Sequence, residues 1–171
     1  MYPCKDPNNY SRLAIPIFDI LGNLVGVNCR RLDGVVKYPS YAKKYLMLQG
    51  FNTSYHLYLL HKILKNNLNS VIVVEGEISC LRMHTRGYNN TVAMSGASLS
   101  KNQATLLAQT VNEVTLLIEA GQAAEQGLIR SLQNLKKVGF FKVKVARLLD
   151  DDPDTVDVKV LEKALKEAYS A

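Results

Sequence analysis

Four consecutive β-branched residues, Val71 to Val74, are followed directly by Glu75 and Gly76, and this run constrains the fold more than any other feature. A short apolar run bounded by a breaker is typical of a strand buried on both faces. In open α/β sheets, ligands bind beyond the carboxyl ends of the strands, so Glu75 stands where a catalytic acid is expected. Gly76 lets the backbone turn tightly beside it. The alternative interpretation is an ordinary strand end with a solvated glutamate.

Segments with strand and helix character alternate from this run to the end of the chain. We expect strands at residues 70–74, 91–94, 113–118 and 140–149. We expect helices at residues 77–86, from Ser98 or Ser100 to Asn112, at residues 122–137 and at residues 158–169. This alternation is typical of a parallel sheet whose helices form right-handed crossovers. The sequence therefore predicts an α/β domain, a parallel sheet flanked by helices, over residues 68–171.

The first 67 residues have a different character. Two strands joined at Leu21-Gly22-Asn23, a basic loop, and a helix from about Ser54 to Lys65 predict a small mixed α+β lobe over residues 1–67. Lys and Arg outnumber Asp and Glu by seven to three in residues 1–50, and by fourteen to twelve in the rest of the chain. Most of the net charge of +6 therefore lies in this lobe.

Basic and aromatic side chains are interleaved in the same lobe. Lys and Arg neutralise phosphates and release counterions, and aromatic rings between them stack on unpaired bases. For any one of these residues, the alternative is a solvated basic face with tyrosines packed in the core. We favour a groove for template or nucleotide. Its candidate residues are Arg12, Arg30, Arg31, Lys37, Tyr38, Lys43 and Lys44.

Acidic residues follow three of the expected strands: Glu75, Glu119, and a cluster that contains Asp152 and Asp154. Because the carboxyl ends of neighbouring parallel strands meet at one edge of a sheet, these acids are expected to converge on a hard-cation site. Mg²⁺ suits such a site when phosphate and water complete its octahedron. Solvated loop acids are the alternative. Ser95-Gly96 forms a short turn before a helix N-terminus, and is a weaker candidate for holding phosphate.

Taken in order, these segments resemble the Toprim-containing polymerase core of bacterial DnaG-type primases. Val73-Val74-Glu75-Gly76 resembles the glutamate motif of that family. Residues 115–124 (TLLIEAGQAA) stand in the place of its Asp-x-Asp motif, and residues 148–154 (LLDDDPD) resemble its acidic loop. The matches to its basic N-terminal part are at residues 12–18, 22–30, 37–38 and 51–58. The resemblance covers nearly all of residues 12–155.

This resemblance implies a Toprim-type sheet and an enzyme, a DNA-directed RNA polymerase of primase type. Such an enzyme synthesises RNA primers on single-stranded DNA from nucleoside triphosphates, and a replicative helicase is an expected partner. The resemblance implies Mg²⁺ or Mn²⁺ as the cofactor, and Glu75 as a catalytic residue that binds metal or relays a proton. The implied metal ligands are Glu75, Glu119, Asp152 and Asp154.

Two positions depart from the family pattern. Gly121 stands where the second aspartate of the Asp-x-Asp motif is expected, and Ser79 stands where an acid usually follows the glutamate by four residues. The loss of charged ligands weakens Mg²⁺ binding and reduces charge compensation at a transferring phosphate. Two other classes therefore remain: a catalytically impaired Toprim module that binds nucleic acid, and a Toprim nuclease.

Composition limits the remaining possibilities. A hydrophobic share of 47% suits a globular core. No apolar run approaches the roughly 20 residues that span a bilayer, and no secretory signal is evident at Met1. Cys4, Cys29 and Cys80 form no zinc-binding pattern and fit a reducing compartment. We therefore expect a cytoplasmic protein that does not associate with membranes.

Overall fold

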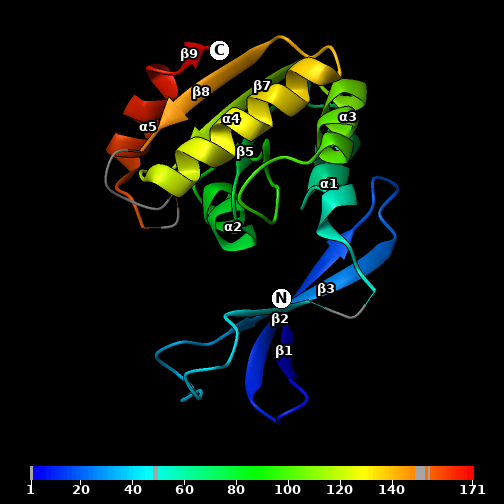
Figure 1. Ribbon diagram of the computed structural model, residues 1–171, viewed down its shortest axis with the longest axis vertical. Coiled ribbons are helices and arrows are strands. Elements are labelled where there is room, and N and C mark those ends of the chain that lie inside the picture. Colours follow the sequence, from blue (N-terminus) through cyan, green and yellow to red (C-terminus); the bar gives the residue numbers. More distant parts are fainter. Residues whose placement is uncertain (1, 48–49, 149–152, 154) are drawn as a thin grey trace. The chain divides into compact units, whose positions relative to one another are not determined.

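The computed structural model describes residues 2–47, 50–148, 153 and 155–171. It divides the chain into two compact units, unit 1 (residues 1–52) and unit 2 (residues 53–171), whose elements are labelled in Figure 1. The division falls between Asn52 and Thr53, and not after residue 67 where the sequence suggests a boundary. Residues 53–67 belong to unit 2, so each unit is described by itself.

Unit 1 is built on a four-stranded antiparallel sheet in the order β1-β2-β3-β4. Its strands are β1 (Tyr2–Lys5), β2 (Ser11–Phe18), β3 (Leu24–Arg31) and β4 (Tyr45–Met47). β2 and β3 are the two expected strands. Between them, the Asp19 carboxylate accepts hydrogen bonds from the amides of Leu21 and Asn23, and Gly22 adopts a φ of +88°. β1 and β4 are short edge strands that the sequence pattern does not predict.

The helix expected near Ser54 to Lys65 lies in unit 2, and it is interrupted. A 3₁₀ turn, η1 (Thr53–Tyr55), is separated from α1 (Leu60–Lys65) by an extended stretch. Tyr58 in that stretch exchanges backbone hydrogen bonds of 2.8 and 3.2 Å with Ala93, and Leu59 adopts a φ of 64°. Pairing with a distant strand therefore overrides the local helical pattern.

Unit 2 contains a five-stranded sheet in the order β6-β5-β7-β8-β9. The strands are β5 (Ser70–Val74), β6 (Thr91–Ala93), β7 (Glu113–Ile118), β8 (Val143–Arg147) and β9 (Tyr169–Ser170). The first four are parallel, as predicted, and β9 pairs antiparallel with β8. β5 lies between β6 and β7, which explains why its apolar run is continuous. Val71, Val73 and Val74 are at most 1% exposed.

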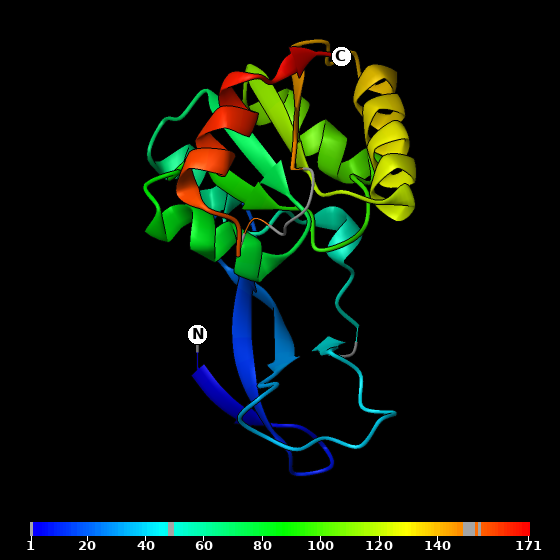
Figure 2. The ribbon, with the colours of Figure 1, turned by 90° about the vertical axis from the view of Figure 1, so that its left-hand side faces the viewer.

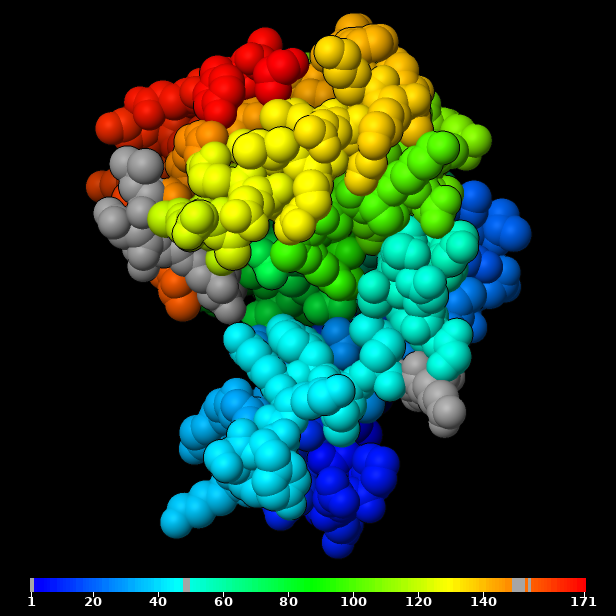
Figure 3. All heavy atoms as spheres, in the orientation of Figure 1, coloured from blue at the N-terminus to red at the C-terminus, as the bar shows by residue number. Residues whose placement is uncertain are grey.

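The main helices of unit 2 cover both faces of this sheet (Figure 2). They are α2 (Glu77–Thr85), α3 (Lys101–Thr110), α4 (Gln122–Lys137) and α5 (Val158–Lys166). α2 and α5 lie on one face and α3 and α4 on the other, and Figure 3 shows α4 running across the face turned to the viewer. α5 ends three residues before the expected Tyr169, because Tyr169 pairs with Val145 at the open edge of β8. The chain has no helix long and apolar enough to cross a membrane among the residues described.

The turn from residue 94 to residue 100 is held tightly against α4. Ser131 on α4 accepts a hydrogen bond of 2.9 Å from the Leu99 amide and donates one of 2.8 Å to the Gly127 carbonyl. A Cβ atom built on Gly127 would lie 2.0 Å from the Ala97 carbonyl oxygen. Only glycine therefore fits at this helical position as it stands.

Gln103 ties the start of α3 to the rest of unit 2. Ser100 is the N-cap and forms a capping box with Gln103, which resolves the expected choice between Ser98 and Ser100. The Gln103 side-chain amide also donates to the carbonyls of Thr53, His56 and Met94 at 3.1, 2.8 and 2.8 Å. This side chain is 1% exposed, and it joins residues 53–56 to β6 and α3.

Candidate metal and nucleotide site

Glu75 lies directly beyond the carboxyl end of β5 and is exposed, whereas the four residues before it are buried. Its backbone carbonyl accepts a hydrogen bond of 2.9 Å from the Ser95 amide. Gly76 is the N-cap of α2. The expected strand–carboxylate–glycine–helix arrangement is therefore present, and it projects Glu75 from the carboxyl edge of the sheet.

Glu119 follows β7, the parallel neighbour of β5, and is half-buried. Glu75 and Glu119 line the same small cavity, whose other lining residues are Met94, Ala97, Leu117, Ile118 and Ala124. The two strand ends thus bring two carboxylates together over an otherwise apolar lining. Carboxylate oxygens are the ligands that hard divalent cations prefer, so the pair suits such an ion. Their role as metal ligands stays a prediction.

Asp152 and Asp154, the other two expected ligands, lie outside the described residues. Within the described ranges, no three His, Cys, Asp or Glu side chains are grouped closely enough to hold a metal ion. Glu75 and Glu119 are therefore the part of the expected ligand set that the structure brings together.

The two positions that depart from the family pattern differ in their surroundings. Gly121 is the N-cap of α4 with a φ of +121°, and no heavy atom lies within 4 Å of a Cβ built on it. Ser79 is 5% exposed inside α2. Gly121 therefore has open space beside Glu119 in the chain, whereas Ser79 is packed into the unit.

Glu77 is a buried acid that the sequence reasoning did not single out. It is 2% exposed in the first turn of α2, two residues after Glu75. A carboxylate in the first turn is favoured by the helix dipole. Burial raises the pKa of the neighbouring Tyr58 and Cys80, and the negative charge of Glu77 adds to both shifts. The signal in the sequence is an acid in the first helical turn after a strand end.

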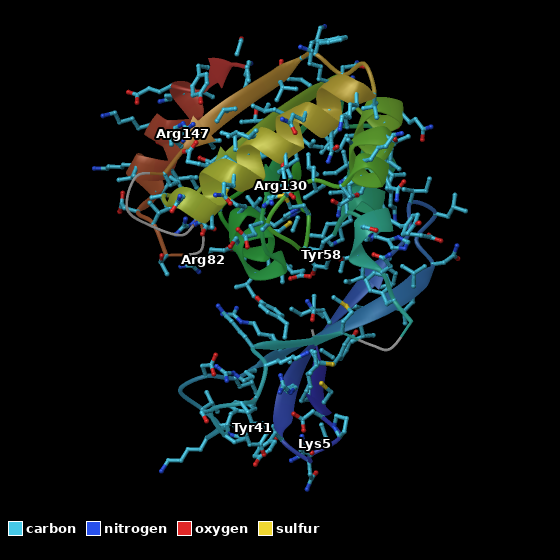
Figure 4. All side chains as sticks on the ribbon, in the orientation of Figure 1. Lys5, Tyr41, Tyr58, Arg82, Arg130 and Arg147 are labelled. Atoms are coloured by element: carbon cyan, nitrogen blue, oxygen red, sulfur yellow. The ribbon has the colours of Figure 1, made fainter. Side chains whose placement is uncertain are left out.

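The carboxyl end of β8 carries a charged pair. Arg147, the last residue of β8 and labelled in Figure 4, forms an ion pair with Glu125 in the first turn of α4 and donates a hydrogen bond of 3.1 Å to the Tyr169 hydroxyl. Hydrogen bonding by Arg147 holds the pKa of Glu125 below its ordinary value. The guanidinium thus links α4, β8 and β9 at the same end of the sheet as Glu75 and Glu119.

Ser95 and Gly96 lie between two residues of the cavity lining, Met94 and Ala97. Ser95 adopts a φ of 52°, and its amide is taken by the Glu75 carbonyl. The N-terminus of α3 is capped further along, by Ser100. The turn is therefore close to the expected site, while its role in holding phosphate stays a prediction.

In unit 1, Arg12 occupies a structural position. It is 1% exposed, its Nε donates to Asp6 at 2.7 Å, and its Nη1 donates to the Lys43 carbonyl at 3.0 Å. Burial disfavours the Asp6 carboxylate, but hydrogen bonds from Arg12 and from the backbone outweigh it, so the pKa of Asp6 is lowered. Arg12 therefore does not present an exposed charge to a phosphate, contrary to expectation.

Tyr38 is also engaged within unit 1. Its hydroxyl accepts a hydrogen bond from the Leu32 amide and donates one to the Ser11 carbonyl. The guanidinium groups of Arg12 and Arg31 each lie 5.4 Å from its ring centroid. Tyr38 thus fastens the basic loop to β2, so base stacking is not needed to explain it.

The other basic candidates lie nearer the surface. Arg31 is half-buried, with Asp33 and the Ala42 carbonyl as partners at 3.0 and 2.7 Å. Arg30 is half-buried with its guanidinium 5.8 Å from the Tyr45 ring centroid. The exposed basic side chains of the set are Lys37, Lys43 and Lys44. These three lysines are the best placed to meet phosphate.

Comparison with known proteins places the chain in a family. The sequence profile of the Toprim-like family matches residues 72–157. A DNA primase from Clostridium acetobutylicum is 33% identical over 162 residues, which cover 93% of this chain and 26% of that protein. The chain therefore spans about a quarter of that relative's length.

Solved structures agree with this assignment. A DnaG catalytic core matches with a TM-score of 0.78 and 25% identity, covering 93% of this chain and 53% of that chain. A DnaG primase catalytic domain bound to single-stranded DNA matches in fold with a TM-score of 0.77 and 23% identity, covering 98% and 58%. The chain belongs to the Toprim-like family. Within it, the chain is a core of the bacterial DnaG primase type, as its motifs suggest.

Proposed function

We propose that this chain forms the catalytic core of a primase, a nucleotidyltransferase that synthesises RNA primers on single-stranded DNA. The observation that carries the proposal is the pair of carboxylates, Glu75 and Glu119, lining one cavity at adjacent carboxyl ends of a Toprim-like sheet. The DNA primase from Clostridium acetobutylicum supports the activity, and the solved catalytic domain bound to single-stranded DNA supports the choice of template.

The cavity suits a divalent metal ion in its chemistry, because its two charged groups are both carboxylates. Glu75 and Glu119 would hold Mg²⁺ or Mn²⁺, with Asp152 and Asp154 as the further ligands that the family resemblance implies. A bound ion would neutralise charge on the nucleotide phosphates. The protein's own contribution is to fix two carboxylates at the ends of buried strands, where their positions are set by the sheet.

In the proposed reaction, the 3′-hydroxyl oxygen of the primer forms a bond to the α-phosphorus of a nucleoside triphosphate. The bond from that phosphorus to the bridging oxygen breaks, and pyrophosphate leaves. The hydroxyl proton must be taken up as the new bond forms, and Glu75, an exposed carboxylate at the cavity, is the side chain we assign to accept it or to hold the metal.

We assign template binding to the exposed lysines of unit 1, Lys37, Lys43 and Lys44, with Arg30 beside them in sequence order on β3. Exposed lysines neutralise phosphate without reading sequence, which suits a template whose bases are read by pairing. Arg12 and Tyr38 support this loop from inside through Lys43 and Leu32.

A second candidate function is a nucleic-acid-binding Toprim module with little catalytic activity. Gly121 and Ser79 favour it, because two acids expected at a fully equipped site are replaced. The two candidates differ in one outcome: the module binds single-stranded DNA but forms no phosphodiester bonds.

The test is primer synthesis on a single-stranded template by the chain and its Glu75→Gln variant. This change keeps the side chain's size and removes its charge, so the fold survives while metal-dependent synthesis falls by about 100-fold or more. Glu162→Gln, a change at an exposed position on α5, is the matched control and retains activity. Equal synthesis by the chain and by Glu75→Gln would refute the assignment of Glu75, and DNA binding without any synthesis would favour the second candidate.

A further inference from the structure

Arg86 joins two segments of unit 2 that are far apart in sequence. It is the C-cap of α2, and its side chain is half-buried. Its Nη1 donates a hydrogen bond of 3.0 Å to the Pro153 carbonyl, and its Nη2 donates one of 2.7 Å to the Val156 carbonyl. One guanidinium therefore spans two carbonyls that lie three residues apart, just before α5.

The other end of α2 is at the candidate site. Glu75 is followed by Gly76, the N-cap, and then by the nine residues of α2 that end next to Arg86. The Arg86 amide donates to the Arg82 and Met83 carbonyls at 3.2 and 3.1 Å, so its backbone is fixed to the helix. α2 is thus a rigid spacer between the carboxyl end of β5 and the residues that Arg86 holds.

The segment that Arg86 holds is the one that carries the expected acidic ligands. Pro153 and Val156 are buried. Asp152 and Asp154 are covalently attached to Pro153, so the distance they can reach is limited by where Pro153 is held. A fork of two donors suits this task better than a single ammonium, because Arg presents its N–H groups in a fixed plane.

We propose that Arg86 is a positioning residue, which sets the distance between Glu75 and the Asp-Pro-Asp segment and so tunes divalent-metal affinity. The inference deepens the proposed function and rests on it. Arg86 itself touches no substrate or metal in this scheme. It acts through the carbonyls of Pro153 and Val156, much as outer-shell groups orient metal ligands.

The experiment is calorimetric titration of the whole chain with Mn²⁺ alone, for the unchanged protein and three variants. Arg86→Ala removes both donors, and Arg86→Lys keeps the charge but not the fork. Arg82→Ala is the matched control: Arg82 is exposed one turn earlier on α2 and is labelled in Figure 4. Hydrogen exchange of the metal-free proteins at residues 155–157 measures the anchoring itself.

The expected result is a 10- to 100-fold weaker Mn²⁺ affinity for Arg86→Ala, the range typical of outer-shell changes. Arg86→Lys should lie between it and the unchanged protein, and Arg82→Ala should match the unchanged protein. Exchange at residues 155–157 should rise in Arg86→Ala and stay unchanged in Arg82→Ala.

Two results would overturn the positioning role. The first is equal Mn²⁺ affinity in folded Arg86→Ala and the unchanged protein, even if the variant melts at a lower temperature. The second is equal hydrogen exchange in Arg86→Ala and Arg82→Ala. If Arg86→Ala does not fold, the comparison of Arg86→Lys with Arg82→Ala decides in the same way. Failure of the proposed function has a different signature, the absence of Mn²⁺ binding in the unchanged protein, and it removes the positioning role too.

Discussion

Gly127 on α4 offers a sharp test of how the candidate site is supported. Replacing a glycine inside a helix by alanine normally stabilises the helix, by up to about 1 kcal/mol. At Gly127 the new Cβ would lie 2.0 Å from the Ala97 carbonyl oxygen, and Cβ contacts under 3.0 Å are essentially never seen. The obstacle is backbone, so α4 or the turn at Ala97 must move by about 1 Å or more.

The steric cost outweighs the gain in helix propensity. Overpacking in a tight interior costs about 1–3 kcal/mol, and here the movement also disturbs the hydrogen bonds of Ser131 to Gly127 and Leu99. We therefore expect Gly127→Ala to destabilise unit 2 by about 2 kcal/mol. The melting temperature should fall by roughly 5–10 °C for a unit of this size. Because Ala97 lines the cavity with Glu75 and Glu119, activity should fall at temperatures where the variant is still folded.

Thermal unfolding followed by circular dichroism at the helix band measures this effect, since the helices of the described residues all lie in unit 2. Gln126→Gly is the matched control, because Gln126 is exposed and precedes Gly127 on the same helix. It should cost about 1 kcal/mol through propensity alone. If propensity governed both sites, the two variants would shift in opposite directions. A melting temperature for Gly127→Ala equal to or above that of the unchanged protein would refute the steric argument.

Two further predictions concern unit 1. Charge reversal at Lys37 and Lys43 should weaken single-stranded DNA binding and reduce its salt dependence by about 0.7 logarithmic units per lost phosphate contact, as measured by fluorescence anisotropy at several salt concentrations; an unchanged slope would place the template elsewhere. The lowered pKa of Asp6 makes its ion pair with Arg12 stabilising above the carboxyl's unfolded pKa of about 4, and this stability is lost as pH falls through the lower folded value. Asp6→Asn should therefore lower stability at neutral pH and flatten its decline in acid, in denaturation curves taken across that range, and a parallel decline in both proteins would count against this pair.

The parallel sheet was open to prediction because its signals are local. β5, β7 and α4 begin and end at the residues that the sequence pattern indicates. Their boundaries depend on apolar runs, a stripe of leucines, and breakers at Gly76 and Gly121, all of which lie within the elements themselves. The meeting of Glu75 and Glu119 in one cavity follows from the order of the strands, which the alternation of strands and helices implies.

The wrong expectations share a cause: they depend on partners distant in sequence. Tyr169 leaves its helical pattern for the edge of β8, and Tyr58 leaves its pattern to pair with Ala93. Arg12 reads as a phosphate ligand by residue type, and only the fold reveals Asp6 beside it in the interior. Likewise, no pattern around Arg86 points to carbonyls some seventy residues later.

The Gln103 hub sets where the Toprim part can be cut from the rest of the chain. A fragment that starts at residue 68, the boundary suggested by sequence, would lose Thr53 and His56 and so remove two of the three carbonyls that receive this buried amide. It would also expose the side of the core formed by Leu57, Leu60 and Ile63, which are at most 1% exposed. The smallest autonomous piece therefore starts at or before Thr53. Dissection of related cores into separately expressed parts should respect this short lead-in segment, because it supplies one wall of the domain that follows it.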